Sequence, residues 1–208
     1  MKYSDSTIIL TTAYLAPIDF FMGVVCFNRV LIEKFESYNK QSYRNRAVIC
    51  AAQGAQSLVV PILKEDKGKS LITDVRIDYT SPWLQQHKRA LISAYQSSPF
   101  FEYYQDEIFE ILDRKYEYLF DLNKALLDKI IELLGISRDI SFTNEFILDY
   151  SNNKKVRDCR FVLSPKKEPL YEKKPYYQVF TPKQGFVSNL SIVDLLFNEG
   201  PESIKYLR

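Results

Sequence analysis

The sequence predicts one domain of the α/β (or α+β) class over residues 1–208, with an N-terminal mixed sheet, a layer of about three helices and a docked C-terminal segment. The first observation is a β-α-β opening. An apolar run over Thr7–Thr12 reads as a buried strand, Asp19–Phe27 as a short helix that Pro17 would start, and Arg29–Phe35 as a second strand. Such a unit of roughly 30 residues is the usual start of a parallel sheet. The second observation is a series of three amphipathic segments after residue 80, which predicts a helical layer packed on the sheet.

Residues 1–80 are expected to be mainly sheet. The runs Ala47–Ala51 and Ser57–Pro61 flank a short segment that contains a glycine, which predicts a hairpin. Lys64–Lys69 is rich in charge and predicts a surface loop. Ile72–Ile77 alternates apolar and polar residues, as a half-exposed strand does.

Residues 81–136 are expected to be mainly helical. Ser81 fits an N-cap and Pro82 a first helical position, so one helix would run from here through about residue 96. A second helix would start at Ser98, and a third would cover residues 116–134 and end at Gly135. Each carries apolar residues at helical spacing and would bury one stripe against the sheet.

Residues 137–208 are expected to be irregular and to end in a helix. Ile140–Tyr150 is short and apolar and predicts a strand or an extended segment, and Cys159–Leu163 predicts another short strand after a polar loop. Near the end, Ser191 would cap a short amphipathic helix and Gly200 would stop it. We expect this apolar tail to dock on the domain.

Composition and charge exclude several kinds of partner. Hydrophobic residues at 46% and charged residues at 26% are ordinary globular values. The formal net charge of +2 is too small to indicate a nucleic-acid or membrane surface, so we expect neither partner. No apolar run approaches the ~20 residues that span a bilayer, and the N-terminus does not have the pattern of a signal peptide. We therefore expect a cytoplasmic protein.

The sequence offers no motif for a metal or a cofactor, and we expect neither. The three cysteines Cys26, Cys50 and Cys159 are far apart and form no C-x-x-C pair, and the chain has one histidine, so a zinc site has no support. A glycine-rich phosphate loop and a G-x-S-x-G elbow are both absent. Cys26 and Cys50 read as buried small hydrophobes, and whether either is reactive stays open.

The densest polar stretch is Gln41–Arg46, which holds Tyr43, Asn45 and two arginines just before an apolar strand. Arg44 and Arg46 alternate on an extended chain and point to opposite faces, so only one would reach a shared site. We prefer Arg46 as a bidentate ligand for a phosphate or carboxylate. The alternative is an arginine that ties loop carbonyls together.

His87 and Tyr14 complete the set of candidates. His87 is the only histidine and would suit a general base near neutral pH; the alternative is a histidine hydrogen-bonded for structural reasons. Tyr14 follows the first strand, and ligands of α/β sheets bind at the carboxyl ends of strands; the alternative is a packed aromatic side chain. We expect the segment around Arg46 and His87 to meet at one polar site.

Several segments, taken in order, resemble the WbqC-like protein family. They are Ala-Tyr-Leu-Ala-Pro at 13–17, Ser-Tyr-Arg-Asn-Arg at 42–46, Leu-Val-Val-Pro at 58–61, Ile-Thr-Asp-Val at 72–75, Trp83 to His87, and Ala-Tyr-Gln-Ser-Ser-Pro-Phe at 94–100. The tail over 189–201 resembles Bacteroidetes-type members. Two departures matter: many members carry Asn or Cys where this chain has Ala47, and often Gln-Pro where it has Thr12-Ala13.

The resemblance implies a protein of unestablished activity linked to the biosynthesis of O-antigen and other surface polysaccharides. In that setting a small-molecule substrate such as a sugar nucleotide or an amino sugar is expected, and acyl or aminoacyl transfer is a reaction consistent with it. His87 would then be catalytic, and Tyr14, Tyr43, Asn45 and Arg46 would bind the substrate. A non-catalytic binding or scaffold protein of a biosynthetic complex is the other function that stays open. The oligomeric state is not specified by the sequence.

Overall fold

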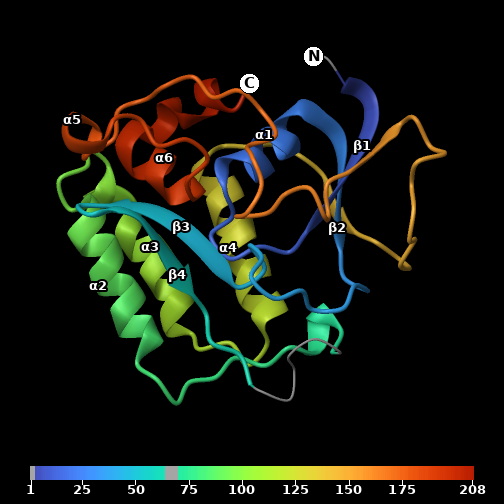
Figure 1. Ribbon diagram of the computed structural model, residues 1–208, viewed down its shortest axis with the longest axis horizontal. Coiled ribbons are helices and arrows are strands. Elements are labelled where there is room, and N and C mark those ends of the chain that lie inside the picture. Colours follow the sequence, from blue (N-terminus) through green and yellow to red (C-terminus); the bar gives the residue numbers. More distant parts are fainter. Residues whose placement is uncertain (1–2, 64–69) are drawn as a thin grey trace.

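A computed structural model describes residues 3–63 and 70–208, and its main sheet has four parallel strands in the order β5-β2-β1-β6 (Figure 1). The strands are β1 (Tyr3–Thr11), β2 (Phe27–Glu33), β5 (Ile140–Phe142) and β6 (Val156–Asp158). The α/β class is confirmed. The loop expected over 64–69 lies outside the described residues.

The predicted β-α-β opening is confirmed, with α1 (Ile18–Cys26) between β1 and β2. This helix is buried almost all round, because it lies between the sheet and the C-terminal segment and most of its residues are apolar. Gly23 lets it approach β1 closely, since a Cβ at that position would lie 2.7 Å from Cδ1 of Ile8. The backbone N–H of Asp19, in the first turn of α1, donates to Oδ1 of Asn189 at 2.9 Å.

The predicted hairpin is also present, as an antiparallel pair of β3 (Arg46–Ala51) and β4 (Gly54–Val59). Ala51 pairs with Gly54, whose φ of +113° suits glycine at the end of a tight turn. The hairpin crosses between the main sheet and the helices in Figure 1.

The strand expected over Ile72–Ile77 is wrong in its first half. The structure has a 3-10 turn, η2 (Ile72–Asp74), followed by isolated bridges from Arg76 to Tyr118 and from Ile77 to Ile62. Val75 and Ile77 are buried at strand spacing, but Ile72 and Val75 are three residues apart, which fits the 3-10 turn. The segment packs against helix α4, and among the described residues it forms isolated bridges and no ladder.

The three predicted helices are present as α2 (Trp83–Tyr95), α3 (Phe101–Asp113) and α4 (Leu119–Leu133), which form a layer beside the sheet in Figure 1. Each buries an apolar stripe. Pro82, not Ser81, is the N-cap of α2, and Gly135 follows α4 with a φ of +62°.

The C-terminal part departs from the sequence prediction at one strand. Instead of Cys159–Leu163, the preceding polar residues 156–158 form β6, because their backbone pairs with the open side of β1. After α5 (Thr181–Gln184), α6 (Ile192–Glu199) and η3 (Gly200–Tyr206) end the chain. Docking of this tail is confirmed, since α6 is buried along nearly its whole length between α1 and α3. Ser191 is its N-cap residue, but its hydroxyl donates to the Leu15 carbonyl rather than capping the helix.

Within the described residues, none of the helices is both long enough and apolar enough to cross a membrane. The division of residues 1–208 as one domain remains a prediction, taken up in the Discussion.

Candidate functional site

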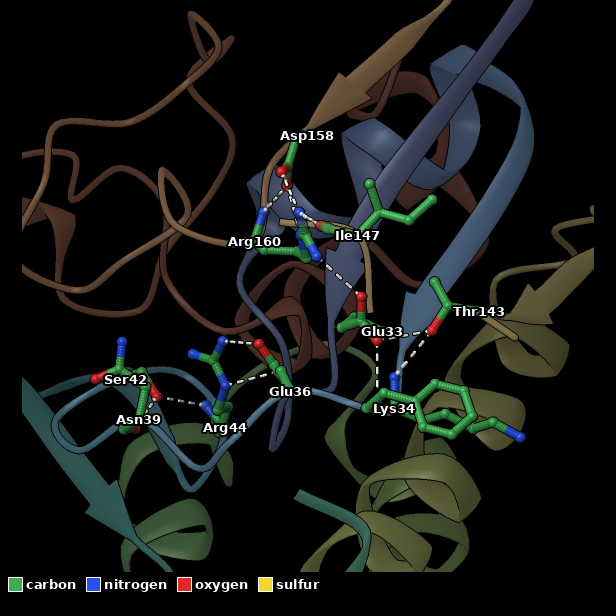
Figure 2. Close-up of polar contacts among 11 residues, drawn as sticks. Glu33, Lys34, Glu36, Asn39, Ser42, Arg44, Thr143, Ile147, Asp158 and Arg160 are labelled. Carbon is green, nitrogen blue, oxygen red and sulfur yellow. Dashed lines mark hydrogen bonds and ion pairs between the residues drawn. The ribbon is translucent and has the colours of Figure 1, made fainter. Parts of the chain in front are cut away.

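The carboxyl ends of the four parallel strands meet at one edge of the main sheet, where ligands of open α/β sheets bind. Glu33 is the last residue of β2, Thr143 follows β5 and Asp158 ends β6. Figure 2 shows these side chains converging there. Oε1 of Glu33 accepts hydrogen bonds from the Thr143 hydroxyl and the Phe35 backbone N–H, both at 2.8 Å.

Arg160 connects the ends of β2 and β6. Its Nη1 donates to Glu33 at 2.9 Å, its Nε and Nη2 donate to Asp158 at 2.9 and 2.6 Å, and Nη2 also donates to the Ile147 carbonyl at 2.8 Å. The Arg160 and Glu33 side chains are fully buried. Rings of Phe146, Tyr150 and Phe161 lie 4.9 to 5.5 Å from its guanidinium carbon. A guanidinium with four of its five N–H groups hydrogen-bonded in this way holds loops rigidly and has little left to offer a ligand.

A second buried ion pair lies beside the first (Figure 2). Arg44 Nε donates to Glu36 at 2.8 Å, and Nη2 donates to the other oxygen of the same carboxylate. Both side chains are buried. Arg44 is therefore the arginine of the polar stretch that the fold uses internally, which leaves Arg46 as the one with unmet donor capacity.

A partly enclosed cavity of about 100 Å³ lies at the carboxyl ends of β1, β2 and β5, between the sheet and α4. Its walls are mostly apolar, with rings from Phe20, Phe120 and Phe142. The polar and charged side chains that line it are those of Thr12, Asn123, Lys124 and Asp128. Lys124 and Asp128 pair with each other at 2.6 Å and are largely exposed, so they form a charged rim.

Asn123 is the buried polar group of this cavity, with 1% of its surface exposed. Its Nδ2 donates to the Arg44 carbonyl at 2.7 Å. This bond fixes the orientation of the amide, because a carbonyl can only accept. The other end, Oδ1, has no hydrogen-bond partner among residues 3–63 and 70–208. The cavity therefore contains a buried acceptor that is free to bind a donor.

Tyr14 and His87 are in direct contact: the Tyr14 hydroxyl lies 2.9 Å from Nδ1 of His87. Both are buried. Burial lowers the pKa of His87 to about 4, while a hydrogen bond to the Val59 backbone, opposing it, raises the pKa. Desolvation raises the pKa of Tyr14 above its ordinary value. At neutral pH the pair is therefore an uncharged imidazole that accepts a hydrogen bond from a phenol.

The polar stretch reaches this pair through Tyr14. The backbone N–H of Tyr14 donates to the Tyr43 carbonyl at 2.9 Å, and Asn45 Nδ2 donates to the Val60 carbonyl at 2.8 Å. Arg46 is half-buried, its Nε has no hydrogen-bond partner, and it pairs with no carboxylate in the part of the chain that the structure describes. None of the five predicted site residues lines the cavity, but Ala13, the neighbour of Tyr14, does. Their functional roles remain predictions.

Sequence reasoning missed Glu33, Asp158, Arg160, Asn123 and Thr12. A usable signal existed for Glu33, a carboxylate directly after the apolar run of a predicted strand, because such positions face the carboxyl edge. Nothing local marks Asn123, which sits in an ordinary helical stripe. Its importance comes from the Arg44 carbonyl, 79 positions earlier in the chain.

Two comparisons with known proteins find similarities that cover most of the chain. The model of the WbqC-like protein family matches residues 12–164 and 169–206. The Uncharacterized protein Rv1507c of Mycobacterium tuberculosis (strain ATCC 25618 / H37Rv) is 28% identical over 194 residues, covering 82% of this chain and 84% of the relative. No solved structure matches the chain at the significance required of these comparisons.

Proposed function

The chain belongs to the WbqC-like protein family, and from this premise we propose that it is a cytoplasmic transferase acting on a sugar-nucleotide or amino-sugar precursor of a surface polysaccharide. The reaction is acyl or aminoacyl transfer. The amine nitrogen of the sugar attacks the carbonyl carbon of an activated ester or thioester, the new C–N bond forms, and the bond to the alcohol or thiol breaks. The amine loses one proton to a base, and the leaving group takes one up.

The observation that supports this proposal is the cavity at the carboxyl edge of the parallel sheet. Small-molecule sites of α/β proteins lie at this edge, and they combine apolar walls with a few polar groups. The cavity has that composition, with phenylalanine rings and one free amide oxygen. Its volume of about 100 Å³ is below the roughly 300 Å³ of a complete ligand pocket, so it would hold one substituent while the rest of the substrate lies outside.

The site residues predicted from the sequence do not line the cavity, and we assign each of them a role in the proposed reaction. The proton would reach His87 through the Tyr14 hydroxyl that it already faces. Burial lowers the pKa of His87 to about 4, so His87 is uncharged at neutral pH and is a weaker base than an exposed imidazole. Arg46 would hold the phosphate of a nucleotide or the carboxylate of a sugar, since its Nε is unpaired. Tyr43 and Asn45 would orient the segment through their backbone and side-chain hydrogen bonds.

The first test is a thermal-shift screen of sugar nucleotides, amino sugars and activated acyl donors. A ligand at 100 times its Kd stabilises a protein by about 2.7 kcal/mol, which such a screen detects. Arg46→Met should abolish the shift given by phosphate-bearing ligands, whereas Arg89→Met, an exposed arginine on α2, should leave it intact. The absence of any shift with all three ligand groups would rule the proposal out.

The second test is product formation, followed by the mass gained by the amino sugar. His87→Gln keeps a side chain that can hydrogen-bond to Tyr14 and Val59 but cannot take up the proton. We expect it to lower kcat by about 10²- to 10⁴-fold, the usual contribution of a general base, with little effect on KM. Unchanged kcat and pH profile in His87→Gln would show that His87 is structural.

A non-catalytic binding or scaffold protein is the second candidate, favoured by exposed apolar side chains on the loops after β5 and β6. Leu148 is 78% exposed and Phe161 50% exposed. Clusters of this kind mark interaction surfaces. In cells that depend on the protein for polysaccharide synthesis, this function predicts that Leu148→Lys impairs synthesis and His87→Gln does not; the enzymatic function predicts the reverse.

A further inference from the structure

The cavity described above contains an acceptor that nothing in the structure satisfies. Asn123 uses its two ends differently: Nδ2 is committed to the Arg44 carbonyl, and Oδ1 is buried without a partner. A buried acceptor without a hydrogen bond destabilises a fold by about 1–3 kcal/mol. Such groups are few in proteins, and one that lines a cavity accepts its hydrogen bond from whatever occupies the cavity, either a water molecule or a bound ligand.

The remaining walls restrict what that molecule can be. The rings of Phe20, Phe120 and Phe142 require apolar contact beside the donor. Thr12, which also lines the cavity, supplies a hydroxyl that can donate or accept. The volume of about 100 Å³ is about a third of the roughly 300 Å³ at which ligand pockets begin, so the cavity would take one substituent and not a whole ligand.

We propose that this cavity is a subsite for a neutral acylamino group of acetamido size that the sugar substrate carries at a position other than the amine that is acylated. The amide N–H donates to Asn123 Oδ1, the amide carbonyl accepts from the Thr12 hydroxyl, and the methyl group contacts the phenylalanine rings. This assignment rests on the proposed function for the identity of the sugar, but the preference for a small amide is a property of the cavity itself.

A free ammonium group fits less well. The cavity walls would desolvate it, and burial of a charge without a paired opposite charge is strongly unfavourable. The carboxylate at the rim, Asp128, is already paired with Lys124. A hydroxyl could donate to Asn123, but a hydroxyl in place of an acetamido group would leave the phenylalanine rings without an apolar partner.

The test uses two small probes of the same shape, N-methylacetamide and methyl acetate, which differ in having or lacking an N–H. Binding is followed by NMR titration of the intact protein. We expect N-methylacetamide to bind about tenfold or more tightly than methyl acetate, the ratio that one lost hydrogen bond to a buried acceptor produces. Leu127→Phe, which fills the cavity from α4, should abolish binding, and Leu133→Phe, the same change on the same helix away from the cavity, should not.

Asn123 itself is tested with two variants, because Asn123→Leu also loses the bond to Arg44 and could fail to fold. Thr12→Val removes only the hydroxyl and should weaken N-methylacetamide binding by several fold. If the folded Asn123→Leu binds both probes equally, the role of Oδ1 is supported. Equal affinity of the wild type for both probes, or undiminished binding in Leu127→Phe, would overturn the subsite.

A parallel titration separates this inference from the proposed function. The ligands are UDP-N-acetylglucosamine, UDP-glucose and UDP-glucosamine, which carry an acetamido, a hydroxyl and an amino group at the same position. Tighter binding of the acetamido sugar supports both proposals. If all three bind equally, the subsite fails and the proposed function stands. If none binds, and the thermal-shift screen finds no sugar nucleotide, amino sugar or acyl donor that binds, while N-methylacetamide still occupies the cavity, the proposed function fails and the subsite stands.

Discussion

Arg160 has a fully buried side chain that donates four hydrogen bonds, and two of its acceptors are the carboxylates of Glu33 and Asp158. Replacing one partner of a buried ion pair leaves the others charged and unpaired in a poorly solvated place. We therefore expect Arg160→Met to lower the free energy of unfolding by about 3–5 kcal/mol, measured by urea denaturation.

The surface pair Arg114–Glu110 provides the control for Arg160. Both of its side chains are more than half exposed, so Arg114→Met should leave the urea midpoint unchanged. The combined replacement of Arg160, Glu33 and Asp158 by uncharged residues should recover part of the loss, because no buried charge is then left unpaired. A loss in Arg160→Met as small as that in Arg114→Met would contradict the assigned role.

His87 should make stability depend on pH in the acidic range. Its pKa is about 4 in the folded chain against 6.5 unfolded, so the unfolded chain takes up the proton first as pH falls. The stabilising contribution is complete above about pH 6.5 and is lost as pH falls toward 4. At pH 5 the loss amounts to about 2 kcal/mol. His87→Gln should lack this loss when unfolding free energies at pH 7 and pH 5 are compared.

The comparison must be a difference between variant and wild type, because Asp194 acts in the opposite direction. Burial raises the pKa of this carboxyl to about 6, although hydrogen bonds from Tyr176, Tyr95 and Gln178 lower it. Its contribution is greatest below about pH 4 and is lost as pH rises through 6. The raw wild-type curve therefore shows the two effects partly cancelled. Identical pH dependence in wild type and His87→Gln would refute the assigned pKa.

At the residue scale, the sequence pointed to the segments that hold Tyr14, Tyr43 and His87 but missed the buried amide of Asn123 and the buried ion pairs. It expected the segment around Arg46 to meet His87, and the two are connected through Tyr14, which bonds to Tyr43 on one side and His87 on the other. It had no means of finding Asn123. A buried asparagine is distinguished only by what its two ends contact, and those partners come from distant parts of the chain.

The C-terminal end of α6 depends on Gly200 for two reasons. Its φ of +52° is a left-handed conformation, and a Cβ there would lie 2.6 Å from the ring of Phe100. Gly135, at the end of α4, has a φ of +62°, but a Cβ there would have no described atom within 4 Å. An alanine at this position would therefore be strained in its backbone but would not clash. Gly135→Ala should therefore cost about 1 kcal/mol.

Gly200→Ala adds overpacking, which destabilises by a further 1–3 kcal/mol or so, and it should lower the melting temperature clearly more than Gly135→Ala. Thermal unfolding of both variants at one pH measures the difference. Equal losses would mean that Phe100 moves aside freely and that α6 is less tightly seated than its burial indicates.

Elements with strong periodicity were predicted and elements formed by pairing alone were not. The helices α2, α3 and α4 carry apolar stripes, and α1 and β1 carry dense apolar runs. Each of these elements can therefore be recognised from its own residues. β6 is three residues of Val-Arg-Asp beside lysines, and it exists because the backbone of β1 offers it an open side. The segment over 72–77 was predicted as a strand, but it pairs only through isolated bridges of Arg76 with Tyr118 and of Ile77 with Ile62.

In the whole molecule, the C-terminal segment forms hydrogen bonds to the hairpin, to the loop before α1 and to α2. The backbone N–H of Ser191 donates to the Val48 carbonyl of β3, and that of Ile192 donates to the Ala16 carbonyl before α1. Asp194 accepts from Tyr95 of α2 and from Tyr176. Asn123 of α4 reaches the polar stretch through Arg44. Because these hydrogen bonds connect distant parts of the chain, we expect it to unfold as one unit.

The prediction of a single domain over residues 1–208 can therefore be tested by unfolding. Trp83 is the only tryptophan, it is buried in α2 against Tyr79 and His87, and its fluorescence reports the region next to the hairpin. Far-UV circular dichroism reports all the helices together. Because one cooperative unit loses both signals at once, the two urea curves should have the same midpoint and slope. Gly200→Ala, at the other end of the chain, should shift both curves by the same amount. If Trp83 fluorescence kept its wild-type midpoint while the dichroism curve moved, the C-terminal segment would be a separate unfolding unit and the single-domain prediction would be wrong.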